Sequence, residues 1–353
     1  MAGPGAGSLA EFVRRYRRVL VYGAGGGGDA VGAVHMYLRV RELGGEPLLA
    51  ALVWERFPLD PTPGPIPIES MPDAEPLGWS LARVTGETRA LRPTGEVWPQ
   101  VARVAAALGV EAYAVDASKG AEGVLAALED AVSELGVQAV IGVDIGGDSL
   151  ALGCEEDLWS PLADAMSVSA LARVGAPALL AVQGPGADGE LSQETVLDYI
   201  AAIASKGGLV GVTGIQASDV PVLERVLEAA VSEASRVPLL AFRGWRGELE
   251  MRGGTRRVRV SPVHSTAFLL DPTAVYEWTP LPRAVEGSMG VARARELLNS
   301  LCVYTELDLE MDLSRARERG AQQVDPAELR ARGREALRRR GCRPVACPGG
   351  RGG

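Results

Sequence analysis

Three short segments combine glycines with acidic residues directly after an apolar run, and they hold the residues best suited to bind a ligand. They are GGGGD at residues 25–29, GGD at 146–148 and GPGADGE at 184–190. Each apolar run is typical of a buried strand. In an open parallel sheet, the loops at the carboxyl ends of the strands share one edge, where ligands bind. We therefore expect all three segments to form one site.

The first segment has the spacing of a phosphate-binding turn. GAGGGG at residues 23–28 matches G-x-G-x-x-G between an expected strand and an expected helix, so amides at the helix start can receive a phosphate. Asp29 follows, and its charge repels a phosphate unless a metal ion lies between them; alternatively, Asp29 only caps the helix. The residues expected to bind a phosphate or nucleotide here are Gly25, Gly26, Gly27 and Gly28.

The second and third segments add further carboxylates. DIGGD at 144–148 ends an expected strand, and an aspartate lies in the third segment. Mg²⁺ and Mn²⁺ favour oxygen ligands, and Mg²⁺ is commonly held by one or two carboxylates together with substrate phosphates. The alternative is that these aspartates only accept hydrogen bonds from turn amides. The expected metal ligands are Asp29, Asp144, Asp148 and Asp188, and the glycines expected to contact the cofactor are Gly146, Gly147 and Gly186.

Two residues are expected to be catalytic, Asp148 and His264. His264 follows an expected strand in a polar turn and is the better acid–base candidate, because His35 lies inside a long apolar helix. Arg56 has the donor fork that binds a phosphate, although it can also pair with a carboxylate at the surface. Glu55 is the one acid placed to bind the ribose of a dinucleotide, and it comes somewhat late for an acid at the end of the second expected strand. NAD is therefore disfavoured as a cofactor.

The order of apolar and amphipathic segments predicts the fold class. Strands and helices alternate from residue 19 to about 235, which is typical of a doubly wound, mostly parallel α/β sheet with helices on both faces, a Rossmann-like fold. We expect a single domain over residues 1–340. Residues 55–99 form a proline-rich insertion or flap, residues 238–340 form a C-terminal extension, and residues 341–353 form a disordered tail.

Several elements of this prediction are specific. We expect a hairpin with strands at 80–84 and 88–91, a helix at 220–235, and short strands at 239–242 and 256–260. Further helices are expected at 291–298 and 326–339.

Composition narrows the function classes. A net charge of -9 and a pI near 5.1 argue against a nucleic-acid partner, because such proteins usually carry a basic face. No run of about 18 apolar residues occurs, and the first residues lack a signal-peptide core, so we expect a cytoplasmic protein without a membrane partner. The four cysteines lack zinc-site spacing and are expected to be reduced. A single asparagine is typical of a heat-adapted organism.

Several motifs together resemble one protein family. GAGGGGDAVGA, WERFPLDPTPGP, DIGGDSLALGCEEDLWSPLADAMS and GPGADGELS are similar to an uncharacterised, largely archaeal family known only as a domain of unknown function. The resemblance spans most of residues 19–280 and implies no established reaction. The first loop is also similar to the start of tubulin-like GTPases, but their G-G-T-G-x-G loop is absent. Residues 143–147 are similar to the opening of sugar kinases, yet a helix follows here in place of their hairpin.

These residues favour a metal-assisted enzyme. It would bind a nucleotide or another phosphorylated metabolite at the sheet edge, with Mg²⁺ or Mn²⁺ offsetting the charge of the ligand during phosphoryl transfer or hydrolysis. A non-catalytic binding or regulatory protein that uses the same crevice is the alternative. The sequence does not predict the oligomeric state.

Overall fold

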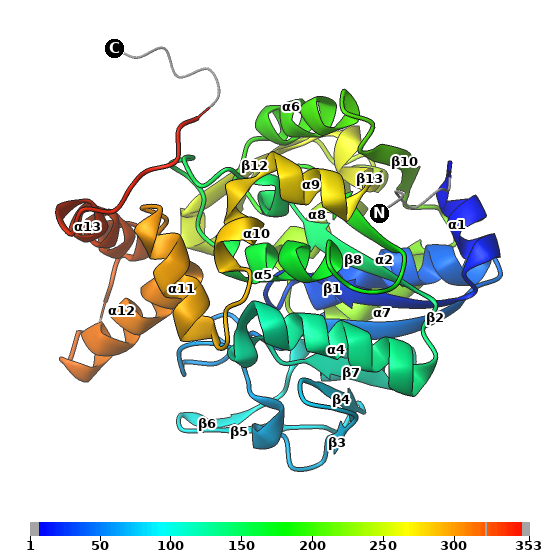
Figure 1. Ribbon diagram of the computed structural model, residues 1–353, viewed down its shortest axis with the longest axis horizontal. Coiled ribbons are helices and arrows are strands. Elements are labelled where there is room, and N and C mark those ends of the chain that lie inside the picture. Colours follow the sequence, from blue (N-terminus) through cyan, green and yellow to red (C-terminus); the bar gives the residue numbers. More distant parts are fainter. Residues whose placement is uncertain (1–6, 322, 348–353) are drawn as a thin grey trace.

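The computed structural model describes residues 7–321 and 323–347 and is built on a large mixed sheet with helices on both faces (Figure 1). The sheet has nine strands in the order β10-β13-β9-β8-β1-β2-β7-β4-β3. Its five central strands are parallel: β1 (Arg18–Gly23), β2 (Glu46–Leu52), β7 (Ala112–Val115), β8 (Ala139–Ile145) and β9 (Ala178–Gln183). This is the predicted Rossmann-like α/β class.

The edges of the sheet are antiparallel. On one side, β13 (Thr266–Leu270) lies between β9 and β10 (Leu209–Gly214). On the other side, β4 (Leu81–Val84) pairs with β7 and with β3 (Glu75–Pro76). Two small ribbons lie outside the sheet, one formed by β5 (Ala90–Arg92) with β6 (Gly95–Val97) and the other by β11 (Gly247–Met251) with β12 (Arg256–Val260).

Alternating side chains of the central strands build two apolar layers. On β1, Val19 and Val21 pack into one cluster, and Leu20 and Tyr22 pack into the other, as the two-residue period of a strand requires. The first layer is covered by α1 (Leu9–Arg15), α2 (Asp29–Glu42), α3 (Gln100–Leu108), α7 (Val220–Ala229) and α8 (Glu233–Phe242). The second is covered by α4 (Gly120–Leu135), α5 (Pro161–Leu171), α6 (Gln193–Ala204), α9 (Pro272–Trp278) and α10 (Pro280–Val285).

Three C-terminal helices extend beyond the carboxyl edge of the sheet. They are α11 (Val291–Ser300), α12 (Glu306–Glu318) and α13 (Pro326–Arg339), drawn in orange and red in Figure 1. Arg330 of α13 donates hydrogen bonds to the carbonyls of Glu156 and Leu158, which fixes this helix against the loop that follows β8. None of the helices in the described parts of the chain is long and apolar enough to cross a membrane.

Three local predictions are wrong. Strands β4 and β5 do not form a hairpin with each other, because β4 joins the main sheet and β5 pairs with β6. The segment predicted as a helix at 220–235 contains two helices, since Ser232 accepts a hydrogen bond from the amide of Ser235 and begins α8. The apolar run at 239–242 therefore belongs to a helix, which a short run cannot reveal by periodicity.

The prediction of reduced cysteines is also wrong. Cys154 bonds to Cys347, and Cys302 bonds to Cys342. The partners lie 193 and 40 residues apart in sequence, and the packing of α13 beside the preceding helices brings them together. Both disulfides hold residues of the segment that we expected to be a tail from residue 341, while residues 348–353 of that tail lie outside the described residues.

We predict that the Cys302–Cys342 disulfide stabilises the fold. Closing a loop of this sequence separation removes unfolded-state entropy equivalent to about 4 kcal/mol. Cys302→Ser should lower the free energy of unfolding by a similar amount in urea titrations, and a reducing agent should remove most of the difference from the wild type. An unchanged midpoint in Cys302→Ser would contradict this role.

Candidate functional site

The three glycine-and-acid segments meet at one cavity of about 1160 Å³ at the carboxyl edge of the sheet. In the sheet, Gly23 of β1 is level with Val143 of β8, so the first and second segments leave the sheet side by side. The order of the parallel strands reverses between β1 and β8, and such a switch point is where open α/β sheets bind ligands. Of the predicted site residues, the cavity wall contains Gly25, Gly26, Gly28, Asp29, Arg56, Asp148 and Asp188.

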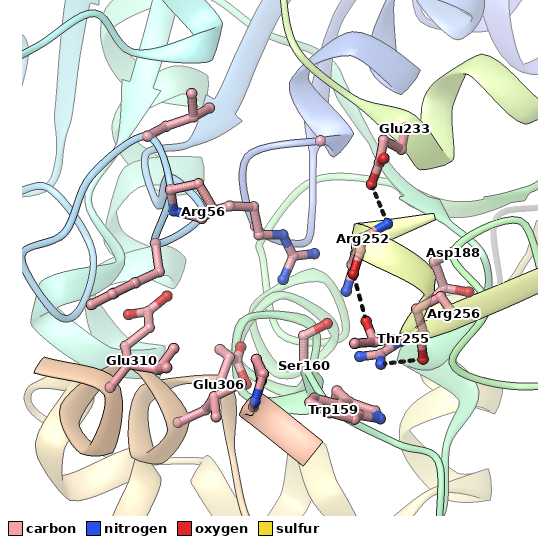
Figure 2. A pocket seen from close by; sticks show the side chains of 18 of the residues that line it. Arg56, Trp159, Ser160, Asp188, Glu233, Arg252, Thr255, Arg256, Glu306 and Glu310 are labelled. Atoms are coloured by element: carbon pink, nitrogen blue, oxygen red, sulfur yellow. Dashed lines mark hydrogen bonds between the residues drawn. The ribbon is translucent and has the colours of Figure 1, made fainter. Parts of the chain in front are cut away.

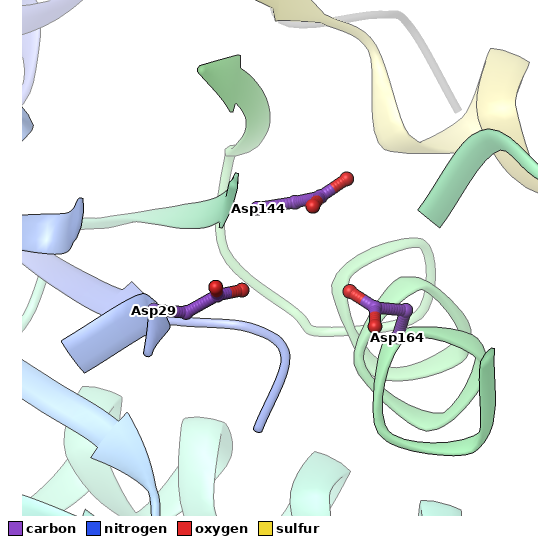
Figure 3. Close-up of side chains that lie close together, drawn as sticks. All are labelled: Asp29, Asp144 and Asp164. Atoms are coloured by element: carbon purple, nitrogen blue, oxygen red, sulfur yellow. The ribbon is translucent and has the colours of Figure 1, made fainter. Parts of the chain in front are cut away.

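A cluster of three buried aspartates lies beside this cavity (Figure 3). Asp29 begins α2, Asp144 is on β8, and Asp164 is in the first turn of α5. One carboxylate oxygen from each lies within 4.8 Å of the others. We call these three residues the aspartate triad. It brings together two predicted metal ligands and one residue, Asp164, that the sequence prediction missed.

The members of the aspartate triad differ in their hydrogen bonds. Asp29 accepts one from the amide of Gly25 at 2.8 Å. Asp144 accepts bonds from the Gly147 amide and from Ser149, which is the turn role that we considered as the alternative. Asp164 is 3% exposed, and its Oδ1 has no hydrogen-bond partner among the described residues. The carboxylate of Asp164 is therefore the one most available to a ligand.

Burial and mutual repulsion act together on these carboxyl groups. Loss of solvation raises the pKa of Asp29 and of Asp164 well above the usual range, and the charge on Asp144 raises both further. The pKa of Asp144 is also raised by burial, although its bonds from Ser149 and Gly147 oppose the shift. Burial and repulsion therefore favour the protonated forms of these carboxyl groups, and a bound cation would favour the ionised forms.

A second acidic group contains Asp148, Asp188 and Glu190. Glu190 accepts hydrogen bonds from the amides of Trp159 and Ser160 at 2.7 and 2.8 Å, and its other oxygen lies 3.3 Å from Arg252. Although burial opposes it, the guanidinium groups of Arg252 and Arg256 lower the pKa of Glu190 to about 2. Glu190 is thus ionised and already fully bonded.

The other two members of this group are less constrained. Burial and the charge of Glu190 raise the pKa of Asp188 to about 7, and its Oδ2 has no partner in the described structure. Asp148 begins a short 3-10 helix and accepts a bond from the Ser160 hydroxyl at 3.3 Å. Its pKa is raised well above normal, first by burial and then by the charges of neighbouring carboxylates.

Two glutamates of α12 complete the acidic wall. Glu306 accepts hydrogen bonds from the amides of Leu162 and Ala163, and burial raises its pKa to about 7. Together with Glu190, it occupies the amides at the start of α5, so this helix end is closed to a phosphate. Glu310, one helical turn later, accepts bonds from the Trp54 ring and from the Gly64 amide, and its pKa is raised by burial to about 8.

The cavity also contains arginines (Figure 2). Arg56 points into it from the segment after β2, and its guanidinium forms no hydrogen bond or ion pair with any described residue. Burial alone would lower the pKa of Arg56, but the charges of Glu190 and Glu306 raise it, so the side chain is a permanent cation. Arg256 lies across the cavity with its guanidinium carbon 3.7 Å from the centroid of the Trp159 ring.

The glycine loop offers fewer free amides than its sequence suggests. The Gly25 amide is bonded to Asp29, and the Gly27 amide donates to the Trp54 carbonyl at 2.7 Å. Within the described chain, only the Gly26 and Gly28 amides of this loop remain without a partner. A Cβ on Gly25 would lie 2.6 Å from the Asp29 carboxylate, so a larger residue would displace the aspartate triad.

Several predicted site residues lie elsewhere. His264 is buried outside the cavity wall, where its Nδ1 accepts a bond from the Ser261 amide. Glu55 lies behind the wall and accepts a bond from the Gln100 amide at the start of α3, and burial raises its pKa to about 7. The remaining predicted residues support turns: Gly146, Gly147 and Gly186 have φ angles of 115°, 102° and 79°, and Gly27 anchors the first loop.

Fold and cavity define the class: a Rossmann-like α/β protein whose switch-point cavity is acidic, with an arginine on one wall that no described residue pairs with. Residues 20–314 match the model of a family described as protein of unknown function, DUF1152, and the chain belongs to that family. The predicted membership is confirmed. No curated protein and no solved structure matches the chain.

Proposed function

We propose that the aspartate triad binds a divalent cation, Mg²⁺ or Mn²⁺. The observation that carries this proposal is the carboxylate of Asp164, which is buried, aimed toward two other carboxylates, and without a partner on Oδ1. Leaving an ionised carboxylate buried and unpaired costs several kcal/mol. A hard cation removes that cost, because carboxylate oxygens are its preferred ligands. Asp148 and Asp188, also predicted as ligands, lie close enough to couple electrically to the triad.

The ligand that fits beside such a cation carries a phosphate. Arg56 supplies an unpaired donor fork, and the amides of Gly26 and Gly28 supply two further donors. The cation would offset the charge of a nucleotide or phosphorylated metabolite and polarise its phosphate for transfer or hydrolysis. Asp148, whose raised pKa favours the protonated carboxyl group, is the proposed general acid. We retain a cytoplasmic location as a proposal; disulfides occur in that compartment in hyperthermophiles.

A non-catalytic binding protein is the second proposal. One observation favours it: His264, the residue we expected to supply acid–base chemistry, lies outside the cavity wall. Asp148→Asn separates the two proposals, since it should abolish turnover in an enzyme and leave ligand binding in a binding protein.

The test is a thermal-shift matrix of phosphorylated ligands with and without Mn²⁺. A ligand that binds only the native state raises the melting temperature by mass action, so we expect the largest rise when Mn²⁺ and a phosphate ester are both present. Asp198→Asn, which removes an exposed carboxylate of α6, is the control and should respond like the wild type. No response to Mn²⁺ at neutral pH would overturn the proposal.

A further inference from the structure

The polarity of the cavity wall changes along α12. The residues of this helix that line the cavity are Glu306, Leu309, Glu310, Leu313 and Arg317, spaced so that they share one face. Glu306 contacts the start of α5, next to the aspartate triad, whereas Leu313 lies seven residues farther on. At 1.5 Å per residue, Leu313 is about 10 Å from Glu306 along the helix axis. Along α12, Leu309 and Leu313 thus give the wall an apolar stretch between the carboxylates near the triad and the guanidinium of Arg317.

The segment after Arg56 supplies the facing apolar wall. Phe57, Pro58 and Leu59 all line the cavity, directly following the arginine proposed to bind the phosphate. The guanidinium carbon of Arg317 lies 4.4 Å from the centroid of the Phe57 ring, which places this segment against the far part of the α12 face. A ligand held at Arg56 thus has apolar surface beside it from two elements.

The cavity is much larger than a phosphate group. Its volume of about 1160 Å³ exceeds the range of about 300–1,000 Å³ that is usual for small-molecule sites. A cation and a phosphate fill only the acidic part. The remaining wall is free to contact the body of a larger ligand.

We propose that the ligand is a phosphate ester of an extended hydrocarbon chain, an inference that rests on the proposed function and selects its substrate class. Leu59, Leu309 and Leu313 offer aliphatic surface to such a chain. The aromatic rings of the wall are poorly placed to stack a nucleotide base, because Arg256 lies over Trp159 and Arg317 lies over Phe57. A hydrocarbon body needs no polar partner in this part of the cavity.

Calorimetric titrations with Mn²⁺ present test this proposal with four ligands: inorganic phosphate, butyl phosphate, octyl phosphate and AMP. Burial of each methylene contributes about 0.8 kcal/mol, or roughly fourfold in affinity, so octyl phosphate should bind on the order of 100-fold more tightly than butyl phosphate. Leu313→Ser should remove most of the octyl advantage and leave inorganic phosphate binding unchanged. Leu313 is only half-buried, so the variant should fold; Leu91→Ser, an exposed site on β5, is the control.

The outcomes separate this proposal from the one on which it rests. Equal affinities for butyl and octyl phosphate, with Mn²⁺-dependent phosphate binding intact, would overturn the hydrocarbon ligand alone. AMP binding more tightly than octyl phosphate would overturn it in favour of a nucleotide. If Mn²⁺ binds but no phosphate compound does, the phosphate site and the hydrocarbon ester are both wrong.

Discussion

In the presence of EDTA, the protein is expected to become less stable as the pH rises from about 5 to about 9. The pKa values of Glu306 and Glu310 are raised by burial to about 7 and about 8, above their unfolded values. At pH values between the unfolded-state pKa and the folded-state pKa, the native state binds more protons than the unfolded state. The contribution of each group to stability is therefore fully present below its unfolded-state pKa. It is lost as the pH rises through its folded-state pKa. Asp188, with a pKa of about 7, acts in the same direction.

The expected effect on the melting temperature is large. Shifts of this size in several buried groups correspond to several kcal/mol, and hence to a fall of roughly 10 °C in melting temperature. Glu190 acts in the opposite direction, but its window lies below the unfolded pKa, at acidic pH, because its folded pKa is about 2. Scanning calorimetry in EDTA at a series of pH values measures the slope. A constant or rising melting temperature would contradict the account.

A matched variant and the addition of Mn²⁺ identify which carboxyl groups cause the dependence of stability on pH. Glu310→Gln retains a side-chain oxygen for the Trp54 and Gly64 donors and lacks the titrating group, so its slope should be shallower. Mn²⁺ competes with protons for the triad, and its stabilising effect should therefore be small at pH 5 and large at pH 8.

The second large effect concerns Arg56. Arg56→Gln should weaken the binding of a phosphate ligand on the order of 100-fold, because two charge-assisted hydrogen bonds are lost at about 1.5–3 kcal/mol each, partly compensated by water. Arg56→Lys keeps the positive charge but lacks the donor fork, so its affinity for the phosphate ligand should lie between those of Arg56→Gln and the wild type. Mn²⁺ should still bind to both variants.

Calorimetry with phosphate in saturating Mn²⁺ measures this effect. Arg257→Gln is the control, since Arg257 is exposed and, among the described residues, forms an ion pair only with Glu250 on the β11–β12 ribbon. Phosphate affinity in Arg56→Gln that stays within about threefold of the wild type would show that the arginine does not contact the ligand.

The central sheet could be predicted because its strands are buried on both faces. Runs such as residues 139–143 of β8 are continuously apolar, and helices of regular period separate them. The C-terminal third was harder to predict. Neither strand β13 nor helix α12 was predicted. The place of β13 between β9 and β10 depends on long-range strand pairing, and the place of α12 depends on tertiary packing. Local periodicity encodes neither.

The candidate site was likewise predictable where it depends on the sheet and not where it depends on long-range packing. Loops at the ends of parallel strands must share an edge, so the sequence alone could predict that Asp29, Asp144, Asp148 and Asp188 lie close together. Asp164 lies in a motif that we singled out, but identifying it required the rotation of α5 about its axis. Glu306 reaches the start of α5 from 144 residues away, and no spacing rule connects such a pair.

Titration of the apo protein with Mn²⁺ by calorimetry, at neutral pH, tests the central claim most directly. The account predicts that the wild type and Asp198→Asn bind Mn²⁺ alike, and that Asp164→Asn binds it about 100-fold more weakly or not at all. Asp164→Asn should remain folded, because the amide removes a buried charge from a crowded acidic group. A folded Asp164→Asn protein that binds Mn²⁺ as tightly as the wild type would contradict the metal site.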